Sequence, residues 1–115
     1  MQATDPQTIL IVDDHPLFRK GVIQLIQAAP EFRFVGEAAS GREGIARARS
    51  LQPDMILLDN HLPGVNGVDA LPALRQAAPS ARIMMLTVSE DEADLAAALR
   101  GGACGYLLKT IEGDS

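Results

Sequence analysis

Short apolar runs alternate with longer amphipathic segments along this chain. The apolar runs predict strands near 8–12, 33–38, 54–58, 82–86 and 104–108. The segments between them carry apolar residues at helical spacing and predict helices near 15–29, 41–51, 67–77 and 91–100. Strands that alternate regularly with helices are typical of a doubly wound α/β fold. We therefore expect a five-stranded parallel sheet with strand order 2-1-3-4-5.

Several local signals indicate where these elements begin and end. Pro16 suits the first turn of the first helix, and Ser40 precedes the second helix as a cap. The segment 62–67 is rich in turn-forming residues and predicts a loop. One stripe of the first helix is expected to face the core and consists of Phe18, Val22, Leu25 and Ala29.

The expected topology predicts that the fold is incomplete within these residues. Right-handed crossovers would place the first helix on one face of the sheet and the next three on the other. A further helix is expected directly after residue 109, where it would join the first. The sequence runs only to residue 115, so we expect the last helix to be missing from this chain.

Composition narrows the classes of function. The chain has 115 residues, of which 47% are hydrophobic but only 3% aromatic, so we expect one domain with an aliphatic core. A net charge of -5 with scattered basic residues disfavours nucleic-acid binding by this chain itself. Without a leader-like start or an apolar run of membrane-span length, we expect a cytoplasmic protein with no membrane partner. The lone Cys104 predicts a small core residue rather than a reactive thiol.

Polar side chains follow four of the five apolar runs. Asp13 and Asp14 follow the first, Asp59 the third, Thr87 the fourth and Lys109 the fifth. In a parallel sheet these strand ends meet at one edge, beside the point where strand order reverses. An aspartate after a strand is often a helix cap or turn former, but nothing structural requires three adjacent anions. Three carboxylates repel one another unless a cation lies among them, and carboxylate oxygens suit Mg²⁺.

The motifs around these residues carry a family resemblance. They are Asp-Asp-His-Pro at 13–16, Leu-Leu-Asp at 57–59, Pro-Gly-x-x-Gly at 63–67, Val-Ser at 88–89 and Gly-Tyr-Leu-Leu-Lys at 105–109. In this order and spacing, essentially the whole chain resembles the receiver domain of two-component response regulators, most closely the NarL/FixJ type. The resemblance implies a flavodoxin-like receiver fold and a signalling role, with catalysis limited to its own phosphorylation and dephosphorylation.

The resemblance also implies residue roles at the acidic cluster. Asp59 would accept a phosphoryl group from a sensor histidine kinase. Asp14 and Asp59 would ligate Mg²⁺ directly, Asp13 mainly through water, and the backbone carbonyl of His61 would supply another oxygen. The His61 side chain itself fits a solvated loop histidine better than a contact with the phosphoryl group. We interpret His15, beside the acidic pair at a helix start, as structural.

Three further residues would read out phosphorylation, by the same resemblance. Lys109 would pair with a phosphoryl oxygen, the Thr87 hydroxyl would donate to another, and the Tyr106 ring would turn inward. Each residue also has an interpretation without a role in signalling. Lys109 would be a solvated charge, Thr87 a β-branched residue at a strand end, and Tyr106 a half-buried residue at an edge. Thr110 departs from the family pattern, because many receivers have proline there, and it leaves the isomer of the 109–110 bond open.

The resemblance extends to partners. The switch would alter the surface of the fourth helix and fifth strand, where a homodimer would form. The parent protein is expected to regulate transcription through a C-terminal DNA-binding helix-turn-helix domain outside these residues.

Other classes on this fold fit less well. A flavodoxin needs a small-residue phosphate-binding turn where this chain has Asp13-Asp14-His15-Pro16. A haloacid-dehalogenase phosphatase needs a second acid at position 61. A receiver-like interaction module that is never phosphorylated would usually have lost part of the acidic cluster.

Overall fold

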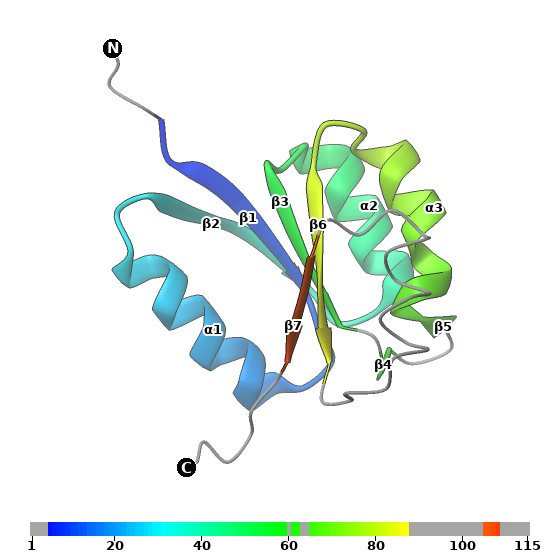
Figure 1. The fold of residues 1–115 in the computed structure, drawn as a ribbon, viewed down its shortest axis with the longest axis horizontal. Coiled ribbons are helices and arrows are strands. Elements are labelled where there is room, and N and C mark those ends of the chain that lie inside the picture. Colours follow the sequence, from blue (N-terminus) through cyan, green and yellow to red (C-terminus); the bar gives the residue numbers. More distant parts are fainter. Residues whose placement is uncertain (1–4, 60, 63–64, 88–104, 109–115) are drawn as a thin grey trace.

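A parallel β-sheet with helices on both faces forms the centre of the molecule (Figure 1). The computed structural model describes residues 5–59, 61–62, 65–87 and 105–108. The strands of the sheet are β1 (Gln7–Val12), β2 (Phe32–Ala38), β3 (Met55–Asp59), β6 (Arg82–Thr87) and β7 (Gly105–Leu108). The helices described are α1 (Pro16–Ala28), α2 (Gly41–Leu51) and α3 (Gly67–Ala77).

The strand order of the sheet is β2-β1-β3-β6-β7, and every neighbouring pair is parallel. This order confirms the predicted 2-1-3-4-5 arrangement. The predicted ends of these strands and helices lie within one residue of the observed ones. The helix predicted over 91–100 lies outside the described residues.

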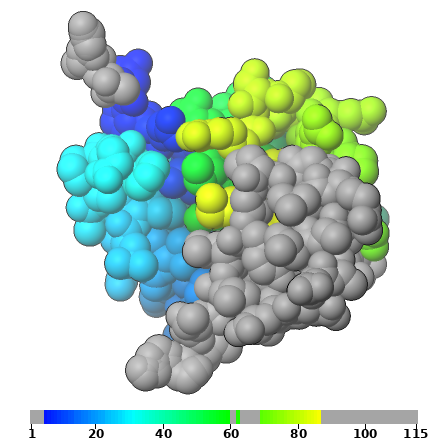
Figure 2. Space-filling view, viewed as in Figure 1, coloured from blue at the N-terminus to red at the C-terminus, as the bar shows by residue number. Residues whose placement is uncertain are grey.

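Alternation along the strands divides the core into two apolar layers. Ile9 and Ile11 of β1 pack with Ile26 of α1 on one face of the sheet. Leu10 and Val12 point to the other face and pack in the cluster that includes residues of α2 and α3. Because successive strand residues face opposite ways, a strand covered on both faces must be apolar at every position. The space-filling view shows strand residues between the α1 and α3 sides of the molecule (Figure 2).

The buried stripe of α1 differs from the predicted one at Leu25. Phe18 and Val22 pack against the sheet as predicted, but Ile26 is the buried residue of the next turn. Leu25 is 73% exposed, so its assignment to the core was wrong. The buried arc is centred near Val22 and Ile26, and Leu25 lies roughly a quarter turn away from that centre.

Local capping fixes both ends of α2. Ser40 caps the N-terminus as predicted, its Oγ accepting a hydrogen bond from the Glu43 N–H at 3.2 Å. At the other end Gln52 adopts a left-handed conformation with φ of 47°. Its Nε2 donates to the carbonyl of Ala77 at 2.7 Å, which ties the end of α2 to the end of α3.

Short paired strands, which were not predicted, lie at and next to the turn-forming segment 62–67. Strand β4 (His61–Leu62) pairs antiparallel with β5 (Val65–Asn66). Strands of two residues are too short to produce an alternating pattern, so the sequence could not indicate them. Leu62 is buried in the α2–α3 side of the core, which anchors the segment that follows β3.

Among the described residues, no helix combines the length and apolar character needed to cross a membrane.

Candidate metal site at the carboxyl edge of the sheet

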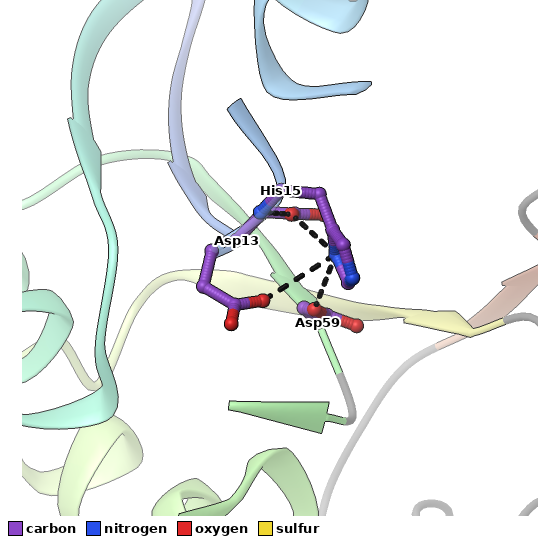
Figure 3. A group of neighbouring side chains, drawn as sticks. Asp13, His15 and Asp59 are labelled. Carbon is purple, nitrogen blue, oxygen red and sulfur yellow. Dashed lines mark hydrogen bonds and ion pairs between the residues drawn. The ribbon is translucent and has the colours of Figure 1, made fainter. Parts of the chain in front are cut away.

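Parallel pairing of β1 with β3 brings the acidic residues together. The register sets Val12 opposite Leu58, so Asp13 and Asp59, the next residues on each chain segment, lie at the same edge of the sheet. Asp14 follows directly, before α1 begins. Figure 3 shows Asp13 coming from the end of β1 and Asp59 from the end of β3. Strand register therefore joins two motifs that are more than 40 residues apart in the sequence.

Burial makes this cluster chemically unusual. Within the described part of the chain, Asp13 and Asp59 are the only polar residues classed as buried, with 0% and 1% exposure. The Asp14 side chain is more accessible, at 31%. Carboxylates withdrawn from water are tolerated only where opposite charge or hydrogen bonds compensate them. The edge of the sheet is thus arranged to receive positive charge.

Hydrogen bonds hold the backbone of this edge in place. The Asp13 N–H donates to the Ala38 carbonyl at 2.9 Å, which fixes the turn against β2. Asp13 Oδ1 accepts the backbone N–H of His15 at 2.6 Å. The Arg19 guanidinium donates to the Asp13 carbonyl and to Glu37 Oε1. These contacts orient the Asp13 carboxylate before any ligand binds.

His15 belongs to the cluster, which the sequence interpretation missed. Its Nδ1 lies 3.2 Å from Asp13 Oδ1, 3.4 Å from Asp14 Oδ1 and 3.4 Å from Asp59 Oδ2. Figure 3 shows the ring turned toward the Asp13 and Asp59 carboxylates. From the sequence, His15 is expected to be structural because it stands at a helix start. Its place directly after the acidic pair was the one available signal.

The donor atoms fit a divalent cation. One ligand atom from each of Asp13, Asp14, His15 and Asp59 lies within 4.8 Å of the other three. Three of these four are carboxylate oxygens, the ligand type that Mg²⁺ prefers together with water and phosphate oxygens. The residues present therefore suit a small divalent ion, which would also compensate the buried charges.

The other predicted residues are placed only in part. Thr87 ends β6 at the same edge, one position after Leu86, the register partner of Asp59. Tyr106 lies on β7 opposite Met85, and His61 lies on β4 opposite Asn66. Lys109 and Thr110 lie outside the described residues, as does Cys104.

Comparison with known protein families identifies the family of this chain. The family model described as the response regulator receiver domain matches residues 9–115. The chain belongs to this family. The receiver is also 51% identical over 112 residues to the nitrate/nitrite response regulator protein NarL of Escherichia coli (strain K12). That match covers 97% of this chain and 52% of the relative, so the receiver spans about half the length of NarL.

Solved structures agree with the fold. The signal receiver domain of a putative response regulator NarL from Mycobacterium tuberculosis has a TM-score of 0.88 and 32% identity, covering 93% of this chain and 86% of that one. A response regulator from Burkholderia pseudomallei, solved with a phosphorylated aspartic acid, a calcium ion and citrate, has a TM-score of 0.82. It is 25% identical, and the match covers 90% of this chain and 60% of that one. The chain is thus a receiver domain of the NarL type of two-component response regulator, rather than a flavodoxin or a phosphatase.

Proposed function

We propose that Asp59 accepts a phosphoryl group from a sensor histidine kinase, in a reaction that requires Mg²⁺ held by Asp13, Asp14 and Asp59. The observation that carries this proposal is the burial of Asp59 beside Asp13 at the carboxyl edge of the sheet, with the donor atoms within 4.8 Å of one another. The phosphorylated aspartic acid and calcium ion of the Burkholderia pseudomallei structure support it.

The chemistry assigned to Asp59 is a direct transfer. A carboxylate oxygen of Asp59 attacks phosphorus, a P–O bond forms, and the P–N bond to the kinase imidazole breaks with its electron pair staying on nitrogen. Mg²⁺ held by Asp13, Asp14 and Asp59 would supply positive charge that stabilises the transferring phosphoryl group. The hydrogen bonds to Asp13 keep the cluster in one geometry, so little reorganisation is needed during transfer. Hydrolysis of the resulting acyl phosphate resets the receiver, and no other substrate is turned over.

Readout is proposed to pass from the phosphoryl group through Thr87 and Lys109 to Tyr106. Attraction of the Thr87 hydroxyl and the Lys109 ammonium to the new phosphoryl oxygens is a local charge event that biases a two-state surface. That surface, at the helix expected over 91–100 and at β7, would mediate homodimer formation. The backbone at Thr87 supports the path, since it ends the strand next to β3.

Transcriptional control is the proposed output of the whole protein. The chain spans about half of NarL, so a C-terminal DNA-binding domain would occupy much of the remainder. The name of that relative points to nitrate or nitrite as the stimulus. Because the proposed output acts on DNA, we place the protein in the cytoplasm. The receiver itself would contact the kinase and a second receiver.

Phosphorylation in vitro tests the central proposal. Acetyl phosphate or phosphoramidate with Mg²⁺ should add one phosphoryl group, measured as an intact-mass shift, and EDTA should prevent it. Asp59→Asn should abolish the shift. Asp69→Asn, an exposed carboxylate at the start of α3, serves as the matched control and should keep it. A mass shift that persists in Asp59→Asn would show that another residue is the acceptor.

Variants of the readout residues test the proposed switch separately. Lys109→Ala and Thr87→Ala should still allow labelling of Asp59, because neither is the nucleophile. Both should reduce the phosphorylation-dependent change in NMR shifts around Tyr106. Normal shifts at Tyr106 in both variants would contradict the readout path while leaving the phosphorylation site intact.

A further inference from the structure

We propose that His15 Nδ1 is a fourth ligand of the divalent-cation site, so that this receiver binds first-row transition-metal ions such as Ni²⁺ in preference to Mg²⁺. The inference deepens the proposed function and rests on the cation site assigned there to Asp13, Asp14 and Asp59. It concerns which ion fills the site. Carboxylates without the imidazole would suit Mg²⁺.

The position of Nδ1 among three carboxylates is the first observation. It lies 3.2 to 3.4 Å from an oxygen of each one. A ring nitrogen carries at most one proton, which can be directed at one carboxylate at a time. Three near-equal approaches therefore do not correspond to three hydrogen bonds. A protonated ring would form ion pairs at these distances, whereas an unprotonated Nδ1 would leave four donor atoms arranged around a common centre.

The distances suit one octahedral ion. Ligand bonds of about 2.0–2.2 Å place neighbouring octahedral ligands roughly 2.8–3.1 Å apart and opposite ligands roughly 4.0–4.4 Å apart. The observed Nδ1–oxygen distances exceed the first range by only a few tenths of an ångström. One ligand atom from each of the four residues lies within 4.8 Å of the other three. A small contraction of side chains would bring all four onto one ion.

The backbone at His15 aims the ring into the cluster. Its N–H is held by Asp13 Oδ1 at 2.6 Å, and its φ and ψ of -100° and 100° are extended, outside the helix. Its side chain makes no capping hydrogen bond to α1. With 57% of the side chain exposed, the ring presents Nδ1 inward while much of its surface stays in water. The ring can thus bind an ion without breaking the helix start.

Ligand chemistry sets the expected selectivity. Carboxylate and water oxygens suit Mg²⁺, whereas imidazole nitrogen suits Zn²⁺, Cu²⁺ and Ni²⁺. A site with three carboxylates and one imidazole should therefore gain more affinity for Ni²⁺ than for Mg²⁺. Removal of the imidazole should reverse that gain and leave the oxygen ligands in place.

Calorimetry on the full chain, with Ni²⁺ and Mg²⁺ titrated separately, tests this selectivity. His15→Asn keeps a small polar residue suited to a helix cap. Its Ni²⁺ affinity should fall at least about tenfold, the lower end of the loss seen when even an outer partner of a metal ligand is removed. Its Mg²⁺ affinity should change by a smaller factor. Equal loss for both ions would overturn the proposal, since it would show that His15 only positions the carboxylates. A gain in Ni²⁺ affinity would also overturn it, because the ring would then compete with the ion.

An NMR measurement on the unmodified protein does not depend on a variant that folds. With ¹⁵N-labelled histidine, diamagnetic Zn²⁺ should shift the Nδ1 resonance of His15 and leave the ring of His61 unchanged. His61 is the other histidine of the chain, so His61→Gln assigns the two signals. An unmoved His15 resonance at saturating Zn²⁺ would overturn the assignment.

Failure of this inference and failure of the proposed site give different results. Unchanged Ni²⁺ affinity in His15→Asn, with Mg²⁺ still bound, overturns the role of His15 alone. Absence of both Ni²⁺ and Mg²⁺ binding in the wild type overturns the cation site itself, and the inference with it.

Discussion

Removal of one charge from the acidic cluster should have opposite effects on stability with and without Mg²⁺. Asp14→Asn is the most informative change, because Asp14 is the accessible member of the cluster and none of the described hydrogen bonds involves its side chain. The substitution keeps the shape of the side chain and removes its charge. Asp13 and Asp59, both buried, remain in place.

The size of the effect follows from the spacing of the carboxylates. At 4.8 Å, the upper limit for the donor atoms, two like charges repel by about 0.9 kcal/mol in water and about 3.5 kcal/mol at an effective dielectric constant of 20. The Asp14 side chain is 31% exposed, so the lower part of this range applies. His15 offsets part of the repulsion when it is protonated. We therefore expect Asp14→Asn to raise the metal-free free energy of unfolding by about 1–2 kcal/mol.

Metal binding should reverse the order of stability. An ion at 1,000 times its dissociation constant stabilises the folded state by about 4.1 kcal/mol. If the substitution weakens Mg²⁺ binding about 100-fold, the same concentration stabilises the variant by only about 1.4 kcal/mol. Added to its gain of about 1–2 kcal/mol, this leaves the variant less stable than the metal-bound wild type. The two proteins should thus exchange rank as Mg²⁺ is added.

Urea unfolding at a series of Mg²⁺ concentrations measures both quantities. Asp5→Asn, an exposed carboxylate before β1, changes the net charge equally and should show neither effect. A variant that is less stable than wild type without metal, but gains as much from Mg²⁺, would refute the reasoning. Asp14 would then be a structural residue of the turn before α1.

Two predictions concern the framework that carries the site, and denaturant unfolding measures both. A Cβ on Gly44 would lie 2.9 Å from both methyl groups of Val12. Gly44→Ala should therefore lower the free energy of unfolding by about 1–3 kcal/mol, although alanine has the better helix propensity. A Cβ on Gly21 would meet nothing within 4 Å, so Gly21→Ala should raise the free energy of unfolding by about 0.5–1 kcal/mol by stabilising α1. Equal effects of the two changes would mean that α2 does not approach β1 this closely. Ser40→Ala should lower the free energy of unfolding by about 1 kcal/mol, because the Glu43 N–H loses its cap. An unchanged midpoint of denaturant unfolding would contradict the capping role.

The sequence alone determined the α/β class, the strand order and most element boundaries. Strands such as β1 are covered on both faces, so they are apolar throughout and stand out from the amphipathic helices. Capping by Ser40 was also readable, because an N-cap interaction spans only three residues. The same local patterns placed Asp13, Asp14 and Asp59 at strand ends, and topology then brought them to one edge.

Tertiary structure alone decided which side chains face one another. Leu25 fits the helical period but lies roughly a quarter turn from the buried arc, because the sheet and not the helix sets the direction of the core. The β4–β5 hairpin is held by two paired residues on each strand, too few to leave a pattern. His15 has an unremarkable position in sequence, yet the turn after β1 directs its Nδ1 to within 3.4 Å of three carboxylates. Side-chain direction at a turn depends on backbone angles and long-range hydrogen bonds, and these are fixed only when the strands have paired.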